Sequence, residues 1–252
     1  MKSAHFRFYA ELNDFLPTDS RGRALTREFE IEASVKDIIE AFGIPHTEVE
    51  VILVNGKSVD FSYRVGDGDS VSVYPVFESF DVSQIVRVRP KPLRESRFVL
   101  DAHLGTLARY LRLLGFDCRY RNDFADRELV ETSVSEGRIL LTRDVGVLKR
   151  SAVTHGYYVR ATDPRAQAFE VVRRFDLFGA VAPFRRCLSC NGGLKRVRKA
   201  EVHDRLPSRT ARHFKEFRMC PDCDRIYWKG SHYDRMLDFV EEVRALGAHA
   251  AG

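Results

Sequence analysis

The fold of this chain is decided by the stretch Phe98-Val-Leu-Asp-Ala-His-Leu-Gly-Thr-Leu-Ala-Arg-Tyr-Leu-Arg-Leu-Leu-Gly115. Its first three residues form an apolar run that is typical of a buried strand, and this strand ends on the carboxylate of Asp101. From Leu104 onward, leucines recur every three or four residues, which is the spacing of one face of a helix, and Gly115 closes it. We therefore expect a strand, an acid and a helix in close succession.

Strands and helices alternate in the residues that follow. Short apolar runs predict further strands, and amphipathic segments predict helices between them. This alternation is typical of an α/β fold with a parallel sheet and covering helices, here over residues 98–183. The further expected strands are 116–120, 138–144 and 155–160, and the further expected helices are 126–136 and 164–178.

Acidic residues stand where the expected strands end. Asp101 and Asp144 follow strands directly, and Asp126 begins a helix at the same edge of the sheet. Because the carboxyl ends of parallel strands meet at one edge, these carboxylates would repel one another unless Mg²⁺ or Mn²⁺ lay among them. A metal held in this way can polarise a phosphodiester and activate water. The alternative for each aspartate is a plain helix cap or turn former.

Two C-x-x-C pairs stand near the C-terminus, Cys187 with Cys190 and Cys220 with Cys223. Two such pairs facing each other make the tetrahedral sulfur cage that zinc prefers, so we interpret residues 184–235 as a zinc ribbon. Two disulfides or a redox-active pair are the alternatives. The stretch 191–219 between the pairs is long, which predicts an extra strand or helix within it.

Charge is divided unevenly along the chain. Residues 1–85 carry 8 Lys and Arg against 15 Asp and Glu, a net charge of −7, whereas the remainder carries 33 against 21, a net charge of +12. The segment 184–235 alone has 14 basic and 6 acidic residues. Such a basic region is typical of proteins that bind nucleic acid, although a solvated charged face is the alternative. The candidate contacts to RNA in this segment are Lys195, Arg196, Arg198, Trp228 and His232.

Residues 1–80 are expected to form a separate acidic domain. Strands are expected at 5–10, 27–31, 50–54 and 70–74, and a capped helix at 34–42. This order, with turns at Asn55-Gly56 and Gly66-Asp-Gly-Asp69, resembles the β-grasp, ubiquitin-like fold of the molybdopterin-synthase small subunit and the thiamine sulfur carriers. Those carriers act through a free C-terminal Gly-Gly, whereas here Tyr74-Pro75 runs on into further chain. We therefore expect the domain to bind a protein partner or its own neighbour.

Two segments lie outside these domains. Residues 81–97 contain Arg-Pro-Lys-Pro and little periodicity, and we expect a linker there, while 236–252 is expected to be a C-terminal helix or tail. No apolar run is long enough to cross a bilayer, and the first residues have no signal-peptide core. These features indicate a cytoplasmic protein with no membrane contact.

Five segments carry the motifs of one known family: 100–115, 126–129, 136–144, the four cysteines, and Tyr227-Trp-Lys-Gly-Ser-His232. They resemble the Mut-seven C-terminal RNase domain, a PIN-like (Rossmannoid) nuclease fold that ends in a zinc ribbon and has a ubiquitin-like companion domain. The resemblance implies that Asp101, Asp126 and Asp144 bind a catalytic metal and that the cysteines bind zinc. It also implies that Arg109, Arg112 and Arg143 face phosphate.

Together these features favour a Mg²⁺- or Mn²⁺-dependent ribonuclease with an N-terminal β-grasp domain, a PIN-like α/β domain and a basic zinc ribbon that binds RNA. The alternative is an RNA-binding adaptor that uses the same ribbon without catalysis. A sulfur-carrier role is disfavoured because the chain lacks the terminal Gly-Gly at the end of the β-grasp domain.

Overall fold

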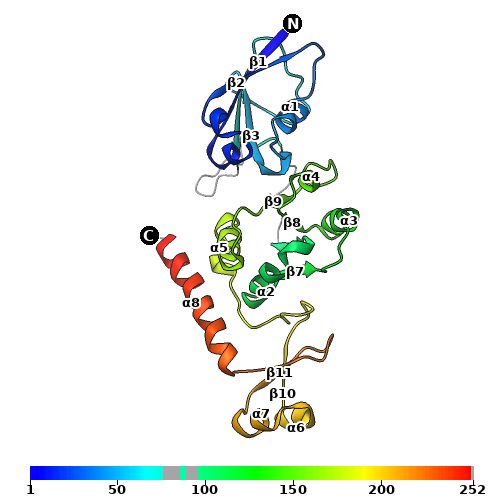
Figure 1. The fold of residues 1–252 in the computed structure, drawn as a ribbon, viewed down its shortest axis with the longest axis vertical. Helices are drawn as coiled ribbons and strands as arrows, with labels where there is room; N and C mark the ends of the chain where they lie inside the picture. Colours follow the sequence, from blue (N-terminus) through cyan, green and yellow to red (C-terminus); the bar gives the residue numbers. More distant parts are fainter. Residues whose placement is uncertain (76–85, 89–95, 251–252) are drawn as a thin grey trace. The chain divides into compact units, whose positions relative to one another are not determined.

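The computed structural model describes residues 1–75, 86–88 and 96–250, so most of the expected linker 81–97 lies outside the described residues. The chain divides into two compact units. One comprises Met1–Glu95 and Asp126–Tyr158, and the other comprises Ser96–Ala125 and Val159–Gly252. Figure 1 labels their helices and strands.

The first unit begins with a five-stranded sheet of order β2-β1-β5-β3-β4, and its buried residues form one continuous apolar core. Strands β1 and β5 pair in parallel, while the other neighbours are antiparallel. Helix α1 (Val35–Ala41) starts as expected, because the Ser34 hydroxyl accepts the Asp37 N–H at 3.1 Å. A strand is present at each expected place, although β1 and β2 begin three residues earlier and end two residues earlier than expected. Strand β4 is an addition that is too short to show a pattern. The strands are β1 (Lys2–Phe8), β2 (Ala24–Phe29), β3 (Val49–Val54), β4 (Lys57–Val59) and β5 (Ser70–Pro75), with 3₁₀ helices η1 (Ala10–Phe15), η2 (Thr18–Ser20) and η3 (His46–Glu48).

The rest of the first unit contributes two helices and two strands. Strands β8 and β9 pair in parallel. The short helix α4 follows β8 and was not expected from the sequence. These elements are α3 (Asp126–Glu136), β8 (Ile139–Thr142), α4 (Val145–Leu148) and β9 (Gly156–Tyr158).

The N-terminal domain contacts the α4–β9 segment of the same unit. The Lys149 ammonium donates to the Glu40 carbonyl at 2.7 Å, and the Tyr158 N–H donates to the Glu48 carboxylate at 2.7 Å. The His46 ring lies 2.8 Å from the Val153 carbonyl through Nε2. The sequence left open whether this domain binds a protein partner or a neighbouring part of its own chain, and the structure shows contact with the neighbouring part of the chain.

The second unit contains the strand and helix with which the sequence analysis began. Strand β6 pairs in parallel with β7, and α2 buries its leucines Leu107 and Leu111. Gly115 ends the helix at φ 101°, and a side chain there would collide with the main chain of Ala182. Strands β7, β6, β8 and β9 follow in that order in one four-stranded sheet. The elements are β6 (Arg97–Leu100), η4 (Ala102–Leu104), α2 (Gly105–Leu113), β7 (Asp117–Tyr120), α5 (Pro164–Arg174) and η5 (Phe178–Ala180).

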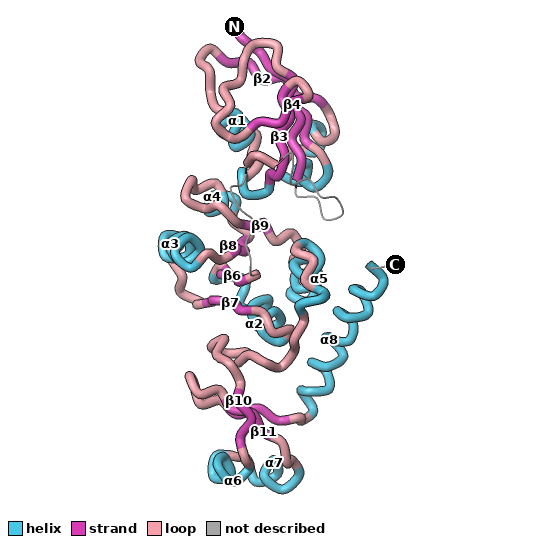
Figure 2. Tube along the Cα trace, turned by 180° about the vertical axis from the view of Figure 1, so that it is seen from behind, coloured by secondary structure: helices cyan, strands magenta, loops and turns pink. Residues whose placement is uncertain are grey.

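The ribbon region is a three-stranded antiparallel sheet of order β10-β11-β12. The extra elements expected between the two cysteine pairs are present, and Figure 2 shows α6 and α7 together at one end of these strands. Helix α8 begins at Ser231, before the expected start of the tail at 236. Among the described residues, none of the helices combines the length and apolar character needed to cross a membrane. The elements are β10 (Lys195–Val197), α6 (Lys199–Val202), η6 (His203–Arg205), α7 (Ser208–His213), β11 (Phe217–Met219), β12 (Ile226–Trp228) and α8 (Ser231–Ala250).

Candidate functional site

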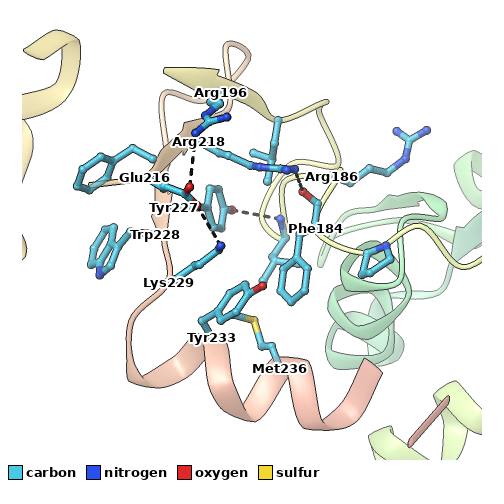
Figure 3. A pocket seen from close by; sticks show the side chains of 14 residues that line it. Phe184, Arg186, Arg196, Glu216, Arg218, Tyr227, Trp228, Lys229, Tyr233 and Met236 are labelled. Atoms are coloured by element: carbon cyan, nitrogen blue, oxygen red, sulfur yellow. Dashed lines mark hydrogen bonds and ion pairs between the residues drawn. The ribbon is translucent and has the colours of Figure 1, made fainter. Parts of the chain in front are cut away.

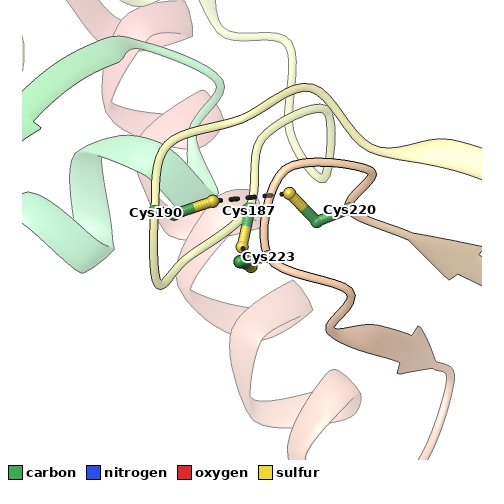
Figure 4. Close-up of side chains that lie close together, drawn as sticks. All are labelled: Cys187, Cys190, Cys220 and Cys223. Atoms are coloured by element: carbon green, nitrogen blue, oxygen red, sulfur yellow. Dashed lines mark hydrogen bonds between the residues drawn. The ribbon is translucent and has the colours of Figure 1, made fainter.

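The four paired cysteines converge on one point (Figure 4). All four Sγ atoms lie within 4.8 Å of one another, and none forms a disulfide. Two of the Sγ–Sγ distances are 3.5 Å, for Cys187 and Cys223, and 3.4 Å, for Cys190 and Cys220. Sulfurs bound about 2.3 Å from one tetrahedral zinc would be about 3.8 Å apart. The cluster could therefore hold such an ion with little movement.

The two cysteine loops share one backbone design. In each, the residue after the second cysteine donates its N–H to the carbonyl of the first: Asn191 to Cys187 at 3.0 Å and Asp224 to Cys220 at 2.9 Å. Asn191 and Asp224 both adopt positive φ, 75° and 57°, which Asn and Asp tolerate better than most residues. The turn chemistry thus places both thiols of each pair on the same side of a tight loop.

Gly192 allows the two loops to approach each other. A Cβ at this position would lie 2.9 Å from the Cys220 sulfur and would collide with the Asp222 carboxylate. Any larger residue would therefore push the first loop away from the second.

Tyr227 supports the cluster from β12. Its hydroxyl lies 3.0 Å from the Cys187 sulfur and accepts the Leu188 N–H at 3.2 Å. Burial opposes ionisation of Cys187, but hydrogen bonds from Tyr227 and from nearby main-chain N–H groups outweigh it and lower the pKa to about 6. Burial raises the pKa of Cys190 to about 12. The cluster thus holds ionised and neutral thiols close together. A divalent cation bound among them would favour loss of the remaining protons and give four thiolates.

Arg112 joins α2 to the first cysteine loop. Its guanidinium donates to the Cys118 carbonyl at 2.7 and 3.1 Å, to the Ser189 carbonyl at 2.7 Å and to the Leu188 carbonyl at 3.2 Å. The residue is 2 % exposed, and burial lowers its pKa while the sulfurs of Cys118 and the cluster oppose that shift. These contacts attach the first cysteine loop to α2, and Arg112 also lines the hollow that contains Arg109. The phosphate-facing role that the resemblance implies for Arg112 stays a prediction.

The three candidate aspartates occupy the expected positions at element ends. Asp101 directly follows β6 in the second unit and is half-buried. Asp144 follows β8 in the first unit and caps α4, since its Oδ1 accepts the Gly146 N–H at 2.6 Å. Asp126 begins α3 and lies 3.0 Å from the Arg150 guanidinium. Within the described residues, the set of candidate metal ligands that the structure gathers is the four cysteines.

A hollow of about 630 Å³ lies beside Asp101, and we call it the arginine pocket. Ala102 and His103, the two residues after Asp101, line it together with Arg109 and Arg225. Among the described residues that line it there is no Asp or Glu, and Arg109 and Arg225 are exposed. The pocket therefore presents cations beside the carboxyl end of β6.

The basic residues of β10 are partly neutralised within the ribbon. Arg196 lies 3.5 Å from Glu216, and the neighbouring Arg198 bonds Glu201 at 2.6 Å. Lys195 is exposed. Figure 3 shows Arg196 and Glu216 at a smaller hollow of about 290 Å³, where Glu216 also pairs with Lys229 at 3.0 Å.

Trp228, which also lines the smaller hollow, lies with His232 at a hollow of about 950 Å³, which we call the aromatic pocket. Arg109 lines it as well, so three of the residues singled out from the sequence meet there. Arg209 and Arg235 also line it, and the sequence analysis missed them because they stand among many other basic residues in 184–235. Arg143, by contrast, follows β8 in the first unit.

Comparison with family models gives two matches. Residues 96–240 match the Mut7-C RNAse domain, and residues 1–81 match the Mut7-C ubiquitin domain. Searches of curated proteins and of solved structures find no match. The RNAse-domain match covers more than half of the chain, and the two matches stand in the order that the sequence resemblance implied. The chain therefore belongs to the Mut7-C RNAse domain family, with the Mut7-C ubiquitin domain at its N-terminal end.

Proposed function

We propose that the chain is a metal-dependent ribonuclease that hydrolyses RNA phosphodiester bonds. The observation that carries the proposal is the placement of two acids at strand ends in a chain of the Mut7-C RNAse family: Asp101 directly follows β6, and Asp144 stands two residues after the end of β8. Acids at the carboxyl ends of parallel strands are well placed for a ligand site. The arginine pocket beside Asp101 adds cations that suit a phosphate backbone.

Asp101, Asp126 and Asp144 would hold Mg²⁺ or Mn²⁺, and the carboxylate oxygen set suits such hard cations. When bound, the metal would supply charge stabilisation and an activated water. The Oδ1 atom of Asp144 accepts the Gly146 N–H, so the metal would bind chiefly through the other carboxylate oxygen. Arg109 would bind the phosphate next to the cleaved bond, and Arg143, which directly precedes Asp144, would bind another.

The four cysteines would hold a structural zinc. Their sulfurs fill a tetrahedral sphere and leave no position for water, so this ion would stabilise the ribbon and take no part in hydrolysis. The ribbon would then present its basic surface to RNA.

The test replaces Asp101 or Asp144 by asparagine, which keeps size and hydrogen bonding but removes the charge. Each variant should lose Mg²⁺- or Mn²⁺-dependent cleavage of labelled RNA, while RNA affinity should stay equal or rise slightly because a charge near phosphate has gone. Asp163→Asn is the matched control. Asp163 caps α5, because its Oδ1 accepts the N–H groups of Arg165 and Ala166, as Asp144 caps α4. The change at Asp163 therefore removes the charge of the same kind of cap without touching the site.

Non-catalytic RNA binding is the second candidate function. It is favoured by the ion pair of Asp126 with Arg150 and by the capping role of Asp144, since both give these acids a purely structural use. In that case the unaltered protein would not cleave single-stranded or structured RNA with either metal, and the asparagine variants would differ from it only in stability. Unchanged cleavage in both variants would assign the activity to other residues or to a contaminant.

A further inference from the structure

The aromatic pocket has the size of a small-molecule site. Its volume is about 950 Å³, and ligand pockets are commonly about 300–1,000 Å³. It is lined by residues from α2, α5, α7, β12 and α8 and by Leu188 of the first cysteine loop, all within the second unit. Two helices of the sheet domain and elements of the C-terminal region thus line the same hollow.

The lining of this pocket is cationic. Four arginines line it, and its described lining residues include no Asp or Glu. Arg165 is already paired with Glu242, and Arg235 bonds the His232 ring at 2.9 Å. Arg109 and Arg209 are exposed, and within the described part of the chain neither has an ion pair or a hydrogen bond through its side chain. Two uncommitted guanidinium groups at one hollow favour an anionic ligand.

Three aromatic rings at the pocket, Phe214, Tyr227 and Trp228, have no ring partner among the described residues. Tyr110 packs on Phe239 with centroids 4.6 Å apart, and Tyr233 stacks on Phe184 at the same distance. The hydroxyl of Tyr227 already contacts Cys187 and Leu188. The Trp228 indole is half-buried and, in Figure 3, stands apart from the stacked pair of Phe184 and Tyr233. Because an indole offers the largest π face of the three rings, Trp228 is the one best suited to receive a planar ligand.

The aromatic pocket adjoins the arginine pocket. Arg109, Leu188 and Tyr227 line both hollows. Gly105, in the arginine pocket, and Arg109 are four residues apart on α2, about 6 Å along the helix axis. A polyanion could thus extend from Trp228 past Arg109 to the residues that follow Asp101.

We propose that the aromatic pocket binds an unpaired nucleotide of single-stranded RNA. The base stacks on Trp228, and the flanking phosphates pair with Arg109 and Arg209. Duplex RNA is excluded because its bases are already stacked and paired, so none can enter a recessed pocket and face the indole. The inference rests on the proposed function, since it names the substrate class of that ribonuclease.

The test measures binding by the full-length, zinc-loaded protein at one salt concentration and without Mg²⁺ or Mn²⁺. The probes are a fluorescein-labelled single-stranded 12-nucleotide RNA, the matching duplex, and single-stranded DNA of the same sequence. Trp228 is the chain's single tryptophan, so its fluorescence reports stacking directly. We expect single-stranded RNA to bind at least tenfold more tightly than the duplex and to quench Trp228.

Two pairs of variants separate the pocket from general charge attraction. Trp228→Leu should weaken single-strand binding about 10- to 100-fold, and Trp228→Phe should restore most of it. Arg209→Gln should weaken binding at least fivefold more than Arg212→Gln. Arg212 is the matched control, because it is exposed on the same helix and does not line the pocket. Both arginines are exposed, so this comparison holds even if changes at Trp228 disturb folding.

Equal binding of duplex and single strand, unquenched Trp228, or equal losses in the two arginine variants would overturn the inference. Tighter binding of single-stranded DNA than of RNA would overturn the assignment to RNA. If single-stranded RNA binds preferentially and quenches Trp228 but is not cleaved, the pocket assignment is supported and the ribonuclease proposal is contradicted. If RNA is cleaved but single strands are not preferred, the ribonuclease proposal is supported and the pocket assignment is contradicted.

Discussion

Arg112 offers the most direct test of how the ribbon is attached to the sheet domain. Arg112→Met keeps an unbranched apolar stem but removes the guanidinium of a residue that is 2 % exposed. That group makes four hydrogen bonds to the carbonyls of Cys118, Leu188 and Ser189. Hydrogen bonds from a charged group contribute about 1.5–3 kcal/mol each, but these four share donors and acceptors. Counting the two 2.7 Å bonds as the main ones, we expect a loss of about 3–5 kcal/mol.

The assay is urea unfolding at a fixed zinc concentration, followed by the fluorescence of Trp228, which lies in the ribbon. Arg112→Lys should fall between the wild type and Arg112→Met, because one ammonium cannot span the same carbonyls as the planar guanidinium. Arg109→Met, three residues earlier on the exposed face, should change stability by less than about 0.5 kcal/mol. A loss below about 1 kcal/mol in Arg112→Met would refute the assigned role, because the carbonyls would then not depend on this side chain.

Two further predictions concern the cysteine cluster and the N-terminal domain. The purified protein should contain about one zinc per chain, and Cys223→Ser should lose that zinc and loosen the ribbon while leaving the first unit intact. Metal analysis measures the zinc content, and amide hydrogen exchange measures the order of each unit. A zinc-free protein with an intact ribbon would contradict the prediction. His46 is buried, and burial together with the charge of Lys36 lowers its pKa, against the opposing effect of the hydrogen bonds that its ring makes to Glu40 and Val153. Because the unfolded chain then binds more protons below about pH 6.5, stability of the N-terminal domain should fall as the pH drops through that value. Hydrogen exchange of β1–β5 between pH 7.5 and pH 5.5 should show this loss of stability, and the loss should be smaller in His46→Gln. An equal pH dependence of stability in both proteins would show that His46 is not the group responsible.

Local order was readable from the sequence wherever periodicity or turn chemistry acts over a few residues. The strand before Asp101, the leucine-rich helix after it and the Ser34 cap all appear where they were expected. Elements of three or four residues, β4 and α4, were missed because they are too short to show a pattern.

The candidate site was readable only in part. The spacing of the four cysteines was enough to predict a cluster, because each C-x-x-C pair folds locally and the two loops need only to meet. The role of Tyr227 was not readable, since stacking on a base and packing at the cluster were equally consistent with its position. In the structure the Tyr227 hydroxyl lies 3.0 Å from the Cys187 sulfur, and the side chains of Tyr227 and its neighbour Trp228 both line the aromatic pocket.

Arg109 and Arg112 show most clearly where sequence stops being sufficient. By itself the sequence determined that both lie on one helix, that two thiol pairs follow, and that the C-terminal part is basic. Only the tertiary structure decided that Arg112 is buried against carbonyls 76 and 77 residues away, while Arg109 stays exposed between two pockets. Helical periodicity is a local property, so it fixes which face a residue occupies. Which residues cover that face depends on how distant parts of the chain desolvate the side chain and accept its hydrogen bonds. A local sequence pattern contains no information about those distant parts.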